Sequence, residues 1–205
     1  MQARELIKRG MAYFRIGCDE EKLRALVFYV EELMRWNKKI NLTGIRDTRL
    51  IICELLYDAF FLHGYMQNVD SLMDLGTGSG VLAIPLSILN ENVRIFAVDK
   101  SLRKIQFLRH IKRTLNLRGL QPLHGRSEEI ACLGVESLVV KAFGTVDAIL
   151  ETGGVHVKYG GRALIVKGKS GVPVDYRGFI LEDTIGYELP EVSKPYTLLV
   201  YKKVS

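Results

Sequence analysis

The residues with the clearest chemical meaning form a glycine-rich turn within Leu72–Pro85, which reads LMDLGTGSGVLAIP. A short apolar run ends in an aspartate, and three glycines follow at alternate positions. Because glycine adopts positive φ angles and carries no Cβ, this pattern lets the backbone come close to a ligand. The apolar segment that follows predicts a helix whose first N–H groups are unpaired and available to that ligand. The residues that we assign to this binding turn are Asp74, Gly76, Gly78 and Gly80.

A second acidic residue indicates that the ligand is a nucleoside. The segment Val93–Val98 (VRIFAV) predicts another strand, and Asp99 follows it directly. A carboxylate at such a strand end can accept hydrogen bonds from both hydroxyls of an adenosine ribose. The turn differs from the dinucleotide fingerprint G-x-G-x-x-G, because Val81 stands where that fingerprint needs Gly or Ala. The form D-x-G-x-G-x-G resembles motif I of the S-adenosylmethionine (SAM) methyltransferases, and we therefore expect SAM as the cofactor.

Three further strand ends carry polar residues, and ligands of open α/β sheets bind at the carboxyl ends of the strands. The third predicted strand is followed by GRSEE, which places Ser127 and Glu128 where they can hold the adenine edge. Acids at these positions are also typical of the first turn of a helix, and the two interpretations are compatible. Lys141 follows the fourth strand and can face the cofactor or an RNA phosphate, although a lone lysine is more often solvated. Lys167 ends the fifth strand and is a candidate for positioning the substrate.

Nucleophiles, general bases and metal ligands are not grouped in this sequence. Cys53 and Cys132 stand in Ile-Cys-Glu and Ala-Cys-Leu contexts, which favours inert thiols over the nucleophile of a cytosine-C5 methyltransferase. The histidines are dispersed, so we expect no metal. The Asn/Asp-Pro-Pro-aromatic motif used for exocyclic amines does not occur. The sequence therefore lacks the motifs that methylation of an exocyclic amine or of cytosine C5 needs.

Alternating helical and strand patterns must position these residues. Asp19 is the predicted N-cap of a long amphipathic helix (DEEKLRALVFYVEELMRWNKK), and a second helical segment is expected over Thr48–Met66. Strands are expected near residues 71–75, 93–98, 121–124, 138–141, 162–166, 178–181 and 196–202, with helices near 80–90, 101–117 and 145–158. The last two strands are joined by a segment with Pro190 and Pro195, so they should form a hairpin.

This order of elements predicts an α/β protein, and the resemblance of its glycine turn to motif I implies a Rossmann-like class I SAM-dependent methyltransferase fold. Its sheet is expected to be mostly parallel, with a C-terminal antiparallel hairpin and additional N-terminal helices. We expect residues 1–66 to form an N-terminal helical cap and residues 67–205 to form the SAM-dependent methyltransferase domain. A chain of 205 residues is long enough to bury one good core.

The net charge of +6 and the isoelectric point near 9.2 raise the question of a nucleic-acid partner. Basic residues are concentrated between positions 100 and 118, at Lys100, Arg103, Lys104, Arg109, Lys112, Arg113 and Arg118. Such a cluster suits the phosphates of a nucleic acid. It is equally compatible with the solvated face of a helix in a lysine-rich chain, and charge alone does not separate the two interpretations.

The cysteine pattern and the hydropathy indicate in which cellular compartment the protein works. The three cysteines form no C-x-x-C pair, which favours reduced thiols in a cytoplasmic protein. No run approaches the roughly 20 apolar residues that span a bilayer. The first residues carry charge throughout without an apolar h-region, so we expect neither a secretory signal nor a membrane partner.

Beyond these patterns, the chain resembles the RsmG/GidB family, bacterial enzymes that methylate guanine N7 in small-subunit (16S) ribosomal RNA. The resemblance covers about residues 20–205. The matching blocks are Trp36-Asn37-Lys38, Asn41-Leu42-Thr43, Asp74–Gly80, Ile84-Pro85-Leu86, Asp99, Lys104, Phe107-Leu108, Gly125–Glu129, Ala142-Phe143 and Lys167-Gly168. The W-N-K-x-x-N-L-T block is much more specific to the family than the glycine turn is.

The resemblance implies an rRNA (guanine-N7)-methyltransferase that uses SAM and acts on 16S rRNA or the small ribosomal subunit. Guanine N7 has an in-plane lone pair and no proton, so alignment and electrostatics suffice for its methylation. Carried over by position, the family's cofactor contacts fall on Gly76, Val81, Ser127, Glu128 and Lys141. Asn41 becomes a candidate for binding the guanine edge, with a helix C-cap as the alternative. We expect the protein to be a monomer.

Three departures from the family pattern keep other functions open. Lys141 stands where the family usually has Arg, Leu55 stands where it has His, and Leu82-Ala83 replaces Pro-Gly. Lysine keeps the positive charge of arginine but loses its planar fork. One alternative is a SAM methyltransferase of a small molecule or protein. The other is an inactive relative that binds a nucleoside or RNA.

Overall fold

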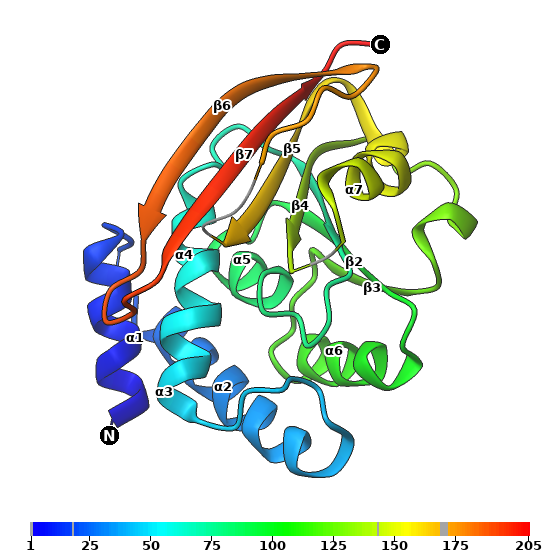
Figure 1. Cartoon of the computed structure of the whole chain (residues 1–205). Coiled ribbons are helices and arrows are strands. Elements are labelled where there is room, and N and C mark those ends of the chain that lie inside the picture. Colours follow the sequence, from blue (N-terminus) through cyan, green and yellow to red (C-terminus); the bar gives the residue numbers. More distant parts are fainter. Residues whose placement is uncertain (1, 18, 143, 169–171) are drawn as a thin grey trace.

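A seven-stranded mixed sheet forms the centre of the computed structural model, which describes residues 2–17, 19–142, 144–168 and 172–205. The strands are β1 (Ser71–Leu75), β2 (Arg94–Asp99), β3 (Leu120–His124), β4 (Val135–Lys141), β5 (Val157–Gly168), β6 (Phe179–Glu188) and β7 (Pro195–Lys203). Their order across the sheet is β3-β2-β1-β4-β5-β7-β6 (Figure 1). The predicted fold class is thus confirmed.

The first five strands are parallel, β7 runs against them, and β6 runs against β7 as the other strand of a hairpin. The register pairs Asp74 with Ala97 of β2 and with Val139 of β4, so β1 lies at the centre of the parallel part. β7 pairs antiparallel with both β5 and β6. Pro195 is the first residue of β7, a position at which its missing N–H costs no ladder bond. The hairpin expected from the prolines is confirmed.

The helices surround this sheet and precede it in the chain. They are α1 (Gln2–Tyr13), α2 (Glu20–Ile40), α3 (Thr48–Leu50), η1 (Ile51–Leu56), α4 (Tyr57–His63), α5 (Ala83–Leu89), α6 (Leu102–Thr114), η2 (Ser127–Glu129), α7 (Val146–Gly153) and η3 (Gly154–His156). Asp19 caps α2 as predicted, since its side chain accepts a hydrogen bond from the N–H of Glu21 at 2.7 Å. The second N-terminal segment is a short helix, a π-helical turn (η1) and a further helix in succession.

Several boundaries differ from the prediction. β5 begins at Val157 rather than near residue 162, and β6 extends to Glu188 rather than ending near residue 181. Most of the added residues are exposed, so they lack the apolar alternation that marks a strand in a sequence. α6 ends at Thr114, before the predicted limit, and α7 ends at Gly153, where a 3₁₀ turn replaces its predicted last turn.

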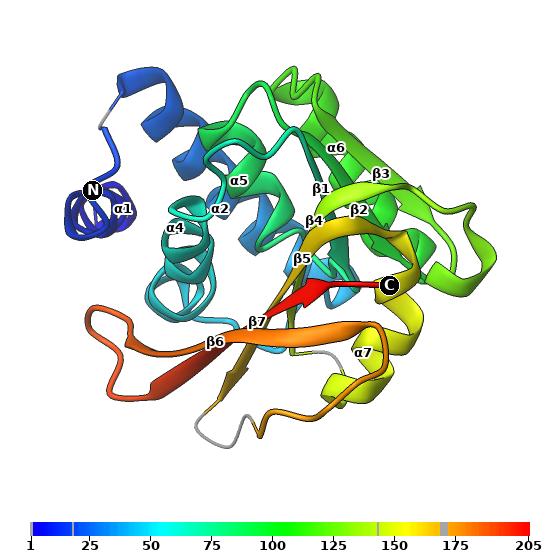
Figure 2. The ribbon, with the colours of Figure 1, turned by 90° about the horizontal axis from the view of Figure 1, so that it is seen from above.

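Two hydrophobic clusters lie on opposite faces of the sheet, because successive strand residues point to opposite faces. In β1, Leu72 belongs to the larger cluster and Met73 to the smaller one. The larger cluster is completed by α1, α2, η1, α4, α5 and α6, and the smaller by α7. Figure 2 shows α7 on one side of the central strands, with α4 and α5 on the other.

The N-terminal helices share a core with the sheet. Buried side chains of α1 and α2, such as Ile7 and Leu26, belong to the same cluster as Leu72 of β1 and Leu164 of β5. The last of these helices ends at His63, and the first strand begins at Ser71. No described helix is long and apolar enough to cross a membrane. Cys18 and Phe143, which entered the sequence interpretation, lie outside the described residues.

Candidate functional site

The glycine turn follows β1 and has the predicted backbone. Gly76, Gly78 and Gly80 have φ angles of 68°, 61° and 77°, in the left-handed region that favours glycine. At Gly80 a side chain is excluded by packing as well, since a Cβ there would lie 2.7 Å from Cδ1 of Ile84. The turn is also tied to the neighbouring strand, because the N–H of Thr77 donates to the carbonyl of Val98 at 2.9 Å.

Asp74 holds this turn from inside the protein. Its carboxylate accepts hydrogen bonds from the Thr77 hydroxyl at 2.6 Å and from the N–H of Ala83, at the start of α5, at 3.1 Å. Asp74 is buried, and burial raises the pKa of its carboxyl to about 6, against the lowering effect of the two hydrogen bonds and with a smaller raising contribution from Asp99. The role of Asp74 is therefore structural, because these contacts join β1, the turn and α5.

Asp99 faces the turn from the end of β2. One carboxylate oxygen accepts from the N–H of Gly78 at 2.9 Å and lies 3.8 Å from Nζ of Lys104. The other accepts from the N–H of Ser101 at 2.8 Å. A carboxylate oxygen has two lone pairs, so acceptor capacity remains on both oxygens. Asp99 is therefore an oriented, charged acceptor at the carboxyl edge of the sheet.

A cavity of about 300 Å³ opens beside Asp99, where the parallel strands end. Its lining comes from the ends of β1, β2, β3 and β4: Leu75, Gly76, Val98, Asp99, Lys100, Lys104, Gly125, Arg126, Ser127, Glu128 and Ala142. Four of the predicted cofactor residues meet here, namely Gly76, Asp99, Ser127 and Glu128. The other five predicted residues, Asp74, Gly78, Gly80, Val81 and Lys141, do not line it.

The turn after β3 presents two acceptors to the cavity. The Ser127 hydroxyl donates to the carboxylate of Glu128 at 3.0 Å. The pKa of Glu128 lies below its usual value because its own backbone N–H and the Ser127 hydroxyl donate to the carboxylate. Glu128 is exposed and therefore ionised at neutral pH, whereas Ser127 is buried. The predicted helix start is confirmed as a single 3₁₀ turn, η2.

His156 fixes this turn from beneath, which the sequence interpretation missed. The ring is fully buried, and its Nδ1 accepts from the N–H of Leu133 at 3.3 Å. Because Nδ1 is an acceptor, the proton lies on Nε2, which donates to the carbonyl of Ser127 at 3.0 Å. A lone histidine distant in sequence gave no signal for this contact.

α2 supports the glycine turn and a loop of its own. The Tyr29 hydroxyl, buried within the core, donates to the carbonyl of Ser79 at 3.2 Å. Further along α2, Asn37 accepts from the N–H of Thr43 at 2.9 Å and donates to the carbonyl of Ile45 at 3.0 Å. Asn37 of the W-N-K-x-x-N-L-T block therefore holds the loop that follows α2.

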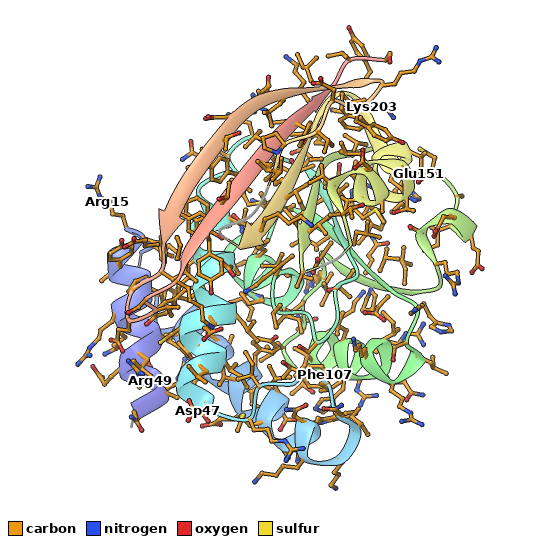
Figure 3. All side chains as sticks on the ribbon, viewed as in Figure 1. Arg15, Asp47, Arg49, Phe107, Glu151 and Lys203 are labelled. Carbon is orange, nitrogen blue, oxygen red and sulfur yellow. The ribbon has the colours of Figure 1, made fainter. Side chains whose placement is uncertain are left out.

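α2 is also fastened to α6. The Trp36 ring stacks on His110, with centroids 5.2 Å apart, and lies 5.5 Å from the Phe107 ring. Nε2 of His110 lies 2.7 Å from the carboxylate of Glu32. Burial raises the pKa of Glu32, but the hydrogen bonds from Arg35 and His110 bring it below its usual value. Figure 3 shows Phe107 between the two helices, so these contacts hold α6 against the N-terminal helices.

Lys141 lies beside the cavity but is directed away from it into a buried ion pair. Its ammonium group donates to the carboxylate of Asp58 and to the carbonyl of Glu54 in the π-helical turn η1. Asp58 is fully buried, and its second oxygen accepts from the Tyr187 hydroxyl of β6 at 2.6 Å. Burial, and next the Asp58 charge, raise the pKa of Tyr187 far above its usual value. Ala142, the next residue, has a φ of 53° and lines the cavity.

The other two candidate substrate residues have local structural contacts. Asn41 is exposed and ends α2 as its C-cap, with a φ of 47°, which agrees with the alternative given for it. Nζ of Lys167 donates to the carbonyl of Gly144 at 2.5 Å, and burial lowers its pKa. Leu55, at the position of the family's histidine, is half-buried and packs against the larger core cluster.

Six of the seven basic residues between 100 and 118 divide into two groups, and the seventh, Arg103, is exposed on α6. Lys100 and Lys104 lie at the cavity with Arg126. At the far end of α6, Arg109, Lys112, Arg113 and Arg118 line a separate open hollow of about 610 Å³. Within the described parts of the chain, no group of three or more His, Cys, Asp or Glu side chains is arranged to hold a metal ion.

Comparison with known proteins decides the family. The family model for GidB, rRNA small subunit methyltransferase G, matches residues 22–172. The chain belongs to this family. Ribosomal RNA small subunit methyltransferase G of Geobacter sp. (strain M21) is 33% identical over 171 residues, covering 82% of this chain and 79% of that protein. The same enzyme of Geotalea uraniireducens is 28% identical over 214 residues, covering 99% and 98%.

Solved structures agree on the fold. A SAM-dependent methyltransferase from Aquifex aeolicus is 13% identical with a TM-score of 0.56, covering 75% of this chain and 92% of that chain. Precorrin-6y C5,15-methyltransferase from Geobacter metallireducens is 17% identical with a TM-score of 0.53, covering 71% and 88%. This GidB-family protein is thus an rRNA methyltransferase with the SAM-methyltransferase fold, and SAM is its cofactor.

The cavity suits that cofactor by its donor and acceptor groups. An adenosine presents hydroxyl donors on the ribose and an amino donor on the base, and the cavity offers the carboxylates of Asp99 and Glu128. At Gly76 the backbone can come close to the cofactor, because glycine has no side chain to separate them. The described lining thus fits the adenosine part of the cofactor.

Proposed function

We propose that this GidB-family protein transfers a methyl group from SAM to N7 of one guanosine in 16S ribosomal RNA. The family match over most of the chain carries this proposal. It is supported by the position of the cavity, at the carboxyl ends of the parallel strands, and by the cations Lys100, Lys104 and Arg126 in its lining. Cations at the opening of a cofactor cavity suit a substrate made of phosphates.

Within this proposal, some residues contact the cofactor and others shape the turn that contacts it. Bound SAM supplies a methyl group activated by its sulfonium. Asp99 holds the ribose hydroxyls, Ser127 and Glu128 hold the adenine edge, and Gly76 lets the backbone approach. Asp74, Gly78 and Gly80 act indirectly, through the shape of the glycine turn and the start of α5. Val81 is half-buried and packs against the larger core cluster beside them.

Guanine N7 matches what the chain offers as an acceptor site. This nitrogen has a lone pair and no proton, so the protein need not supply a general base and contributes through alignment. The described residues of the cavity lining include no histidine, and the carboxylate of Asp74 is turned into the protein. The methylation rate should therefore show no steep rise between about pH 6 and 8 from a catalytic base.

Three residues position the loops that contact the substrate, namely Lys141, Lys167 and Asn41. Lys141 anchors the end of β4 through Asp58, and Lys167 ties the far side of the same loop through the carbonyl of Gly144. Among the described residues between these anchors, Ala142 lines the cavity. We propose that the loop holds the guanine, and that Asn41 ends α2 so that its following loop contacts RNA.

The remaining expectations follow from this substrate. A protein that modifies ribosomal RNA works where ribosomes are assembled, so we place it in the cytoplasm. We propose that it acts as a monomer, with residues 1–66 as a helical cap on a methyltransferase domain of residues 67–205.

The test is transfer of labelled methyl from SAM to 16S rRNA transcribed in vitro and to small subunits from cells that lack the modification. We expect N7-methylguanine at one position, located by borohydride–aniline cleavage and by mass spectrometry of the nucleosides. Asp99→Ala serves as the matched control and should transfer much less methyl at the same SAM concentration. Methyl found on adenine, cytosine or a ribose, or transfer only to a small molecule or protein, would overturn the proposal.

A further inference from the structure

The hollow at the far end of α6 is lined by cations whose side chains have no partners among the described residues. Arg109, Arg113 and Arg118 are exposed and Lys112 is half-buried. None of the four forms an ion pair or a side-chain hydrogen bond with any residue that the structure describes. Four like charges around one open hollow repel one another, so the folded protein gains nothing from gathering them unless anions occupy the hollow.

Helix stability does not account for this cluster. Cations near a helix C-terminus interact favourably with the helix dipole, but only within the last turn. That reasoning covers Lys112 and Arg113, whereas Arg109 lies before the last turn and Arg118 lies beyond the helix. The terminal carbonyls of His110, Ile111 and Lys112 also accept from Thr114, Leu115 and Leu117, not from the cationic side chains.

We infer that the hollow lined by Arg109, Lys112, Arg113 and Arg118 is a second RNA-backbone site, separate from the site where the methyl group is transferred. The inference rests on the proposed function, because it takes RNA as the substrate. α6 begins directly after Asp99 and the cavity, so its far end lies away from the reaction. From Lys104 at the cavity to Arg113 the helix rises by about 14 Å, at about 1.5 Å per residue.

That separation gives the hollow a specific role in binding RNA. The strands of duplex DNA have one phosphate per roughly 3.4 Å of helix axis. With a spacing of that order in RNA, the hollow would contact RNA about four nucleotides or more from the reacting guanosine. Contacts to phosphates fix register and orientation without reading sequence. The hollow thus orients a neighbouring segment of RNA while the cavity receives the target base.

The surrounding charges limit where the RNA can lie. A neighbouring hollow shares Asn116, Leu117 and Arg118, and it is also lined by the acids Asp19, Glu21 and Glu91. Glu91 is paired with Lys22 at 3.6 Å, which neutralises part of that surface. Phosphates are therefore favoured on the Arg109–Arg113 side of Arg118 and disfavoured beyond it.

The test compares three variants with the parent protein on in vitro transcribed 16S rRNA. The first neutralises the hollow (Arg109→Gln, Arg113→Gln and Arg118→Gln), with glutamine chosen as a good helix former. The second keeps its charge by replacing the same residues with lysine. The third, the control, removes three positive charges elsewhere (Lys8→Gln, Arg15→Gln and Arg177→Gln). Figure 3 shows Arg15 on the opposite side of the molecule from α6.

Each phosphate contact contributes about 0.7–0.9 to the slope of log affinity against log salt. The neutralised variant should therefore lose about 2.1–2.7 of that slope. Raising salt from 50 to 150 mM should weaken the parent's RNA affinity about 10- to 20-fold more than the variant's. The KM for RNA should rise, while the affinity for SAM and the kcat at saturating RNA stay unchanged. The lysine variant and the control should follow the parent.

Two results would overturn the inference. One is an equal salt slope and KM in the neutralised and control variants, which would make the hollow a solvated surface. The other is an equal loss in the lysine variant, which would show that charge is not the cause. The proposed function fails separately: a parent that binds 16S rRNA with a steep salt slope but transfers no methyl would leave the hollow standing and refute the reaction.

Discussion

The buried pair between Lys141 and Asp58 allows a prediction whose size follows from burial. Lys141→Ala removes the cation from a carboxylate that is 0% exposed. Among the described side chains, the Tyr187 hydroxyl then remains as its hydrogen-bond partner. Removing one member of a buried ion pair destabilises a protein by about 3–5 kcal/mol, because the remaining charge has neither water nor a counterion. We expect a loss of that size in the free energy of unfolding.

The assay is urea unfolding followed by circular dichroism, arranged as a double-mutant cycle. Asp58→Asn should also destabilise the protein, and the double variant should be about 0.5–3 kcal/mol more stable than the sum of the single losses predicts. Lys158→Ala is the matched control, since Lys158 is 50% exposed and pairs with Glu136 at 2.6 Å. An exposed pair of this kind is worth about 0–1 kcal/mol.

Methyl transfer gives a second measurement on the same residue. Lys141→Arg keeps the charge and should retain more activity than Lys141→Ala, with part of the deficit caused by the different shape of the guanidinium group. The reasoning is refuted if Lys141→Ala costs no more than Lys158→Ala, or if the losses from Lys141 and Asp58 simply add.

Three further predictions concern the cofactor cavity and the two turns that border it. Asp99→Ala should weaken SAM binding about 10- to 100-fold in calorimetry, since a charged hydrogen-bond acceptor contributes about 1.5–3 kcal/mol; unchanged affinity would remove Asp99 from the site. Burial raises the pKa of Asp74 from 3.8 to about 6, so the folded protein binds this proton more tightly than the unfolded chain does. The resulting stabilisation is complete below about pH 4 and is lost as the pH rises through 6. The free energy of unfolding of Asp74→Asn, measured with urea, should therefore rise by about 3 kcal/mol relative to that of the parent over that range of pH. A difference between the two proteins that does not change with pH would contradict the assignment. His156→Phe removes both hydrogen bonds at the turn after β3, so SAM affinity should fall about five- to tenfold by calorimetry while RNA affinity in filter binding is kept. Loss of both in parallel would mean general unfolding.

Local patterns carried most of the fold prediction. The turn after β1 was predictable because glycine spacing reports directly on backbone φ, and the hairpin because prolines exclude a crossover helix. Strand limits were less predictable where residues are exposed, as in the first half of β5. There the hydrogen bonds of the sheet, rather than the side chains, extend the strand.

The site was predictable only as far as chain order places residues at strand ends. Gly76, Asp99, Ser127 and Glu128 meet at the cavity because the carboxyl ends of parallel strands share one edge. The direction of a long side chain is a different matter. Lys141 stands at a strand end, yet its ammonium group donates to Asp58, which is far away in sequence. No local sequence pattern predicts that contact.

The two acids of the glycine turn illustrate how environment separates like residues. Asp74 is the last residue but one of β1 and Asp99 is the last residue of the adjacent β2, so sequence spacing treats them alike. Asp74 is enclosed by the Thr77 hydroxyl and the start of α5, and burial makes its ionisation costly. Asp99 instead has two backbone N–H donors and Lys104 beside it, so its charge is supported at the cavity. The fold thus places the acid that must shape the turn inside and the acid that must meet the cofactor at the edge, and only their partners, not their types or spacing, make that distinction.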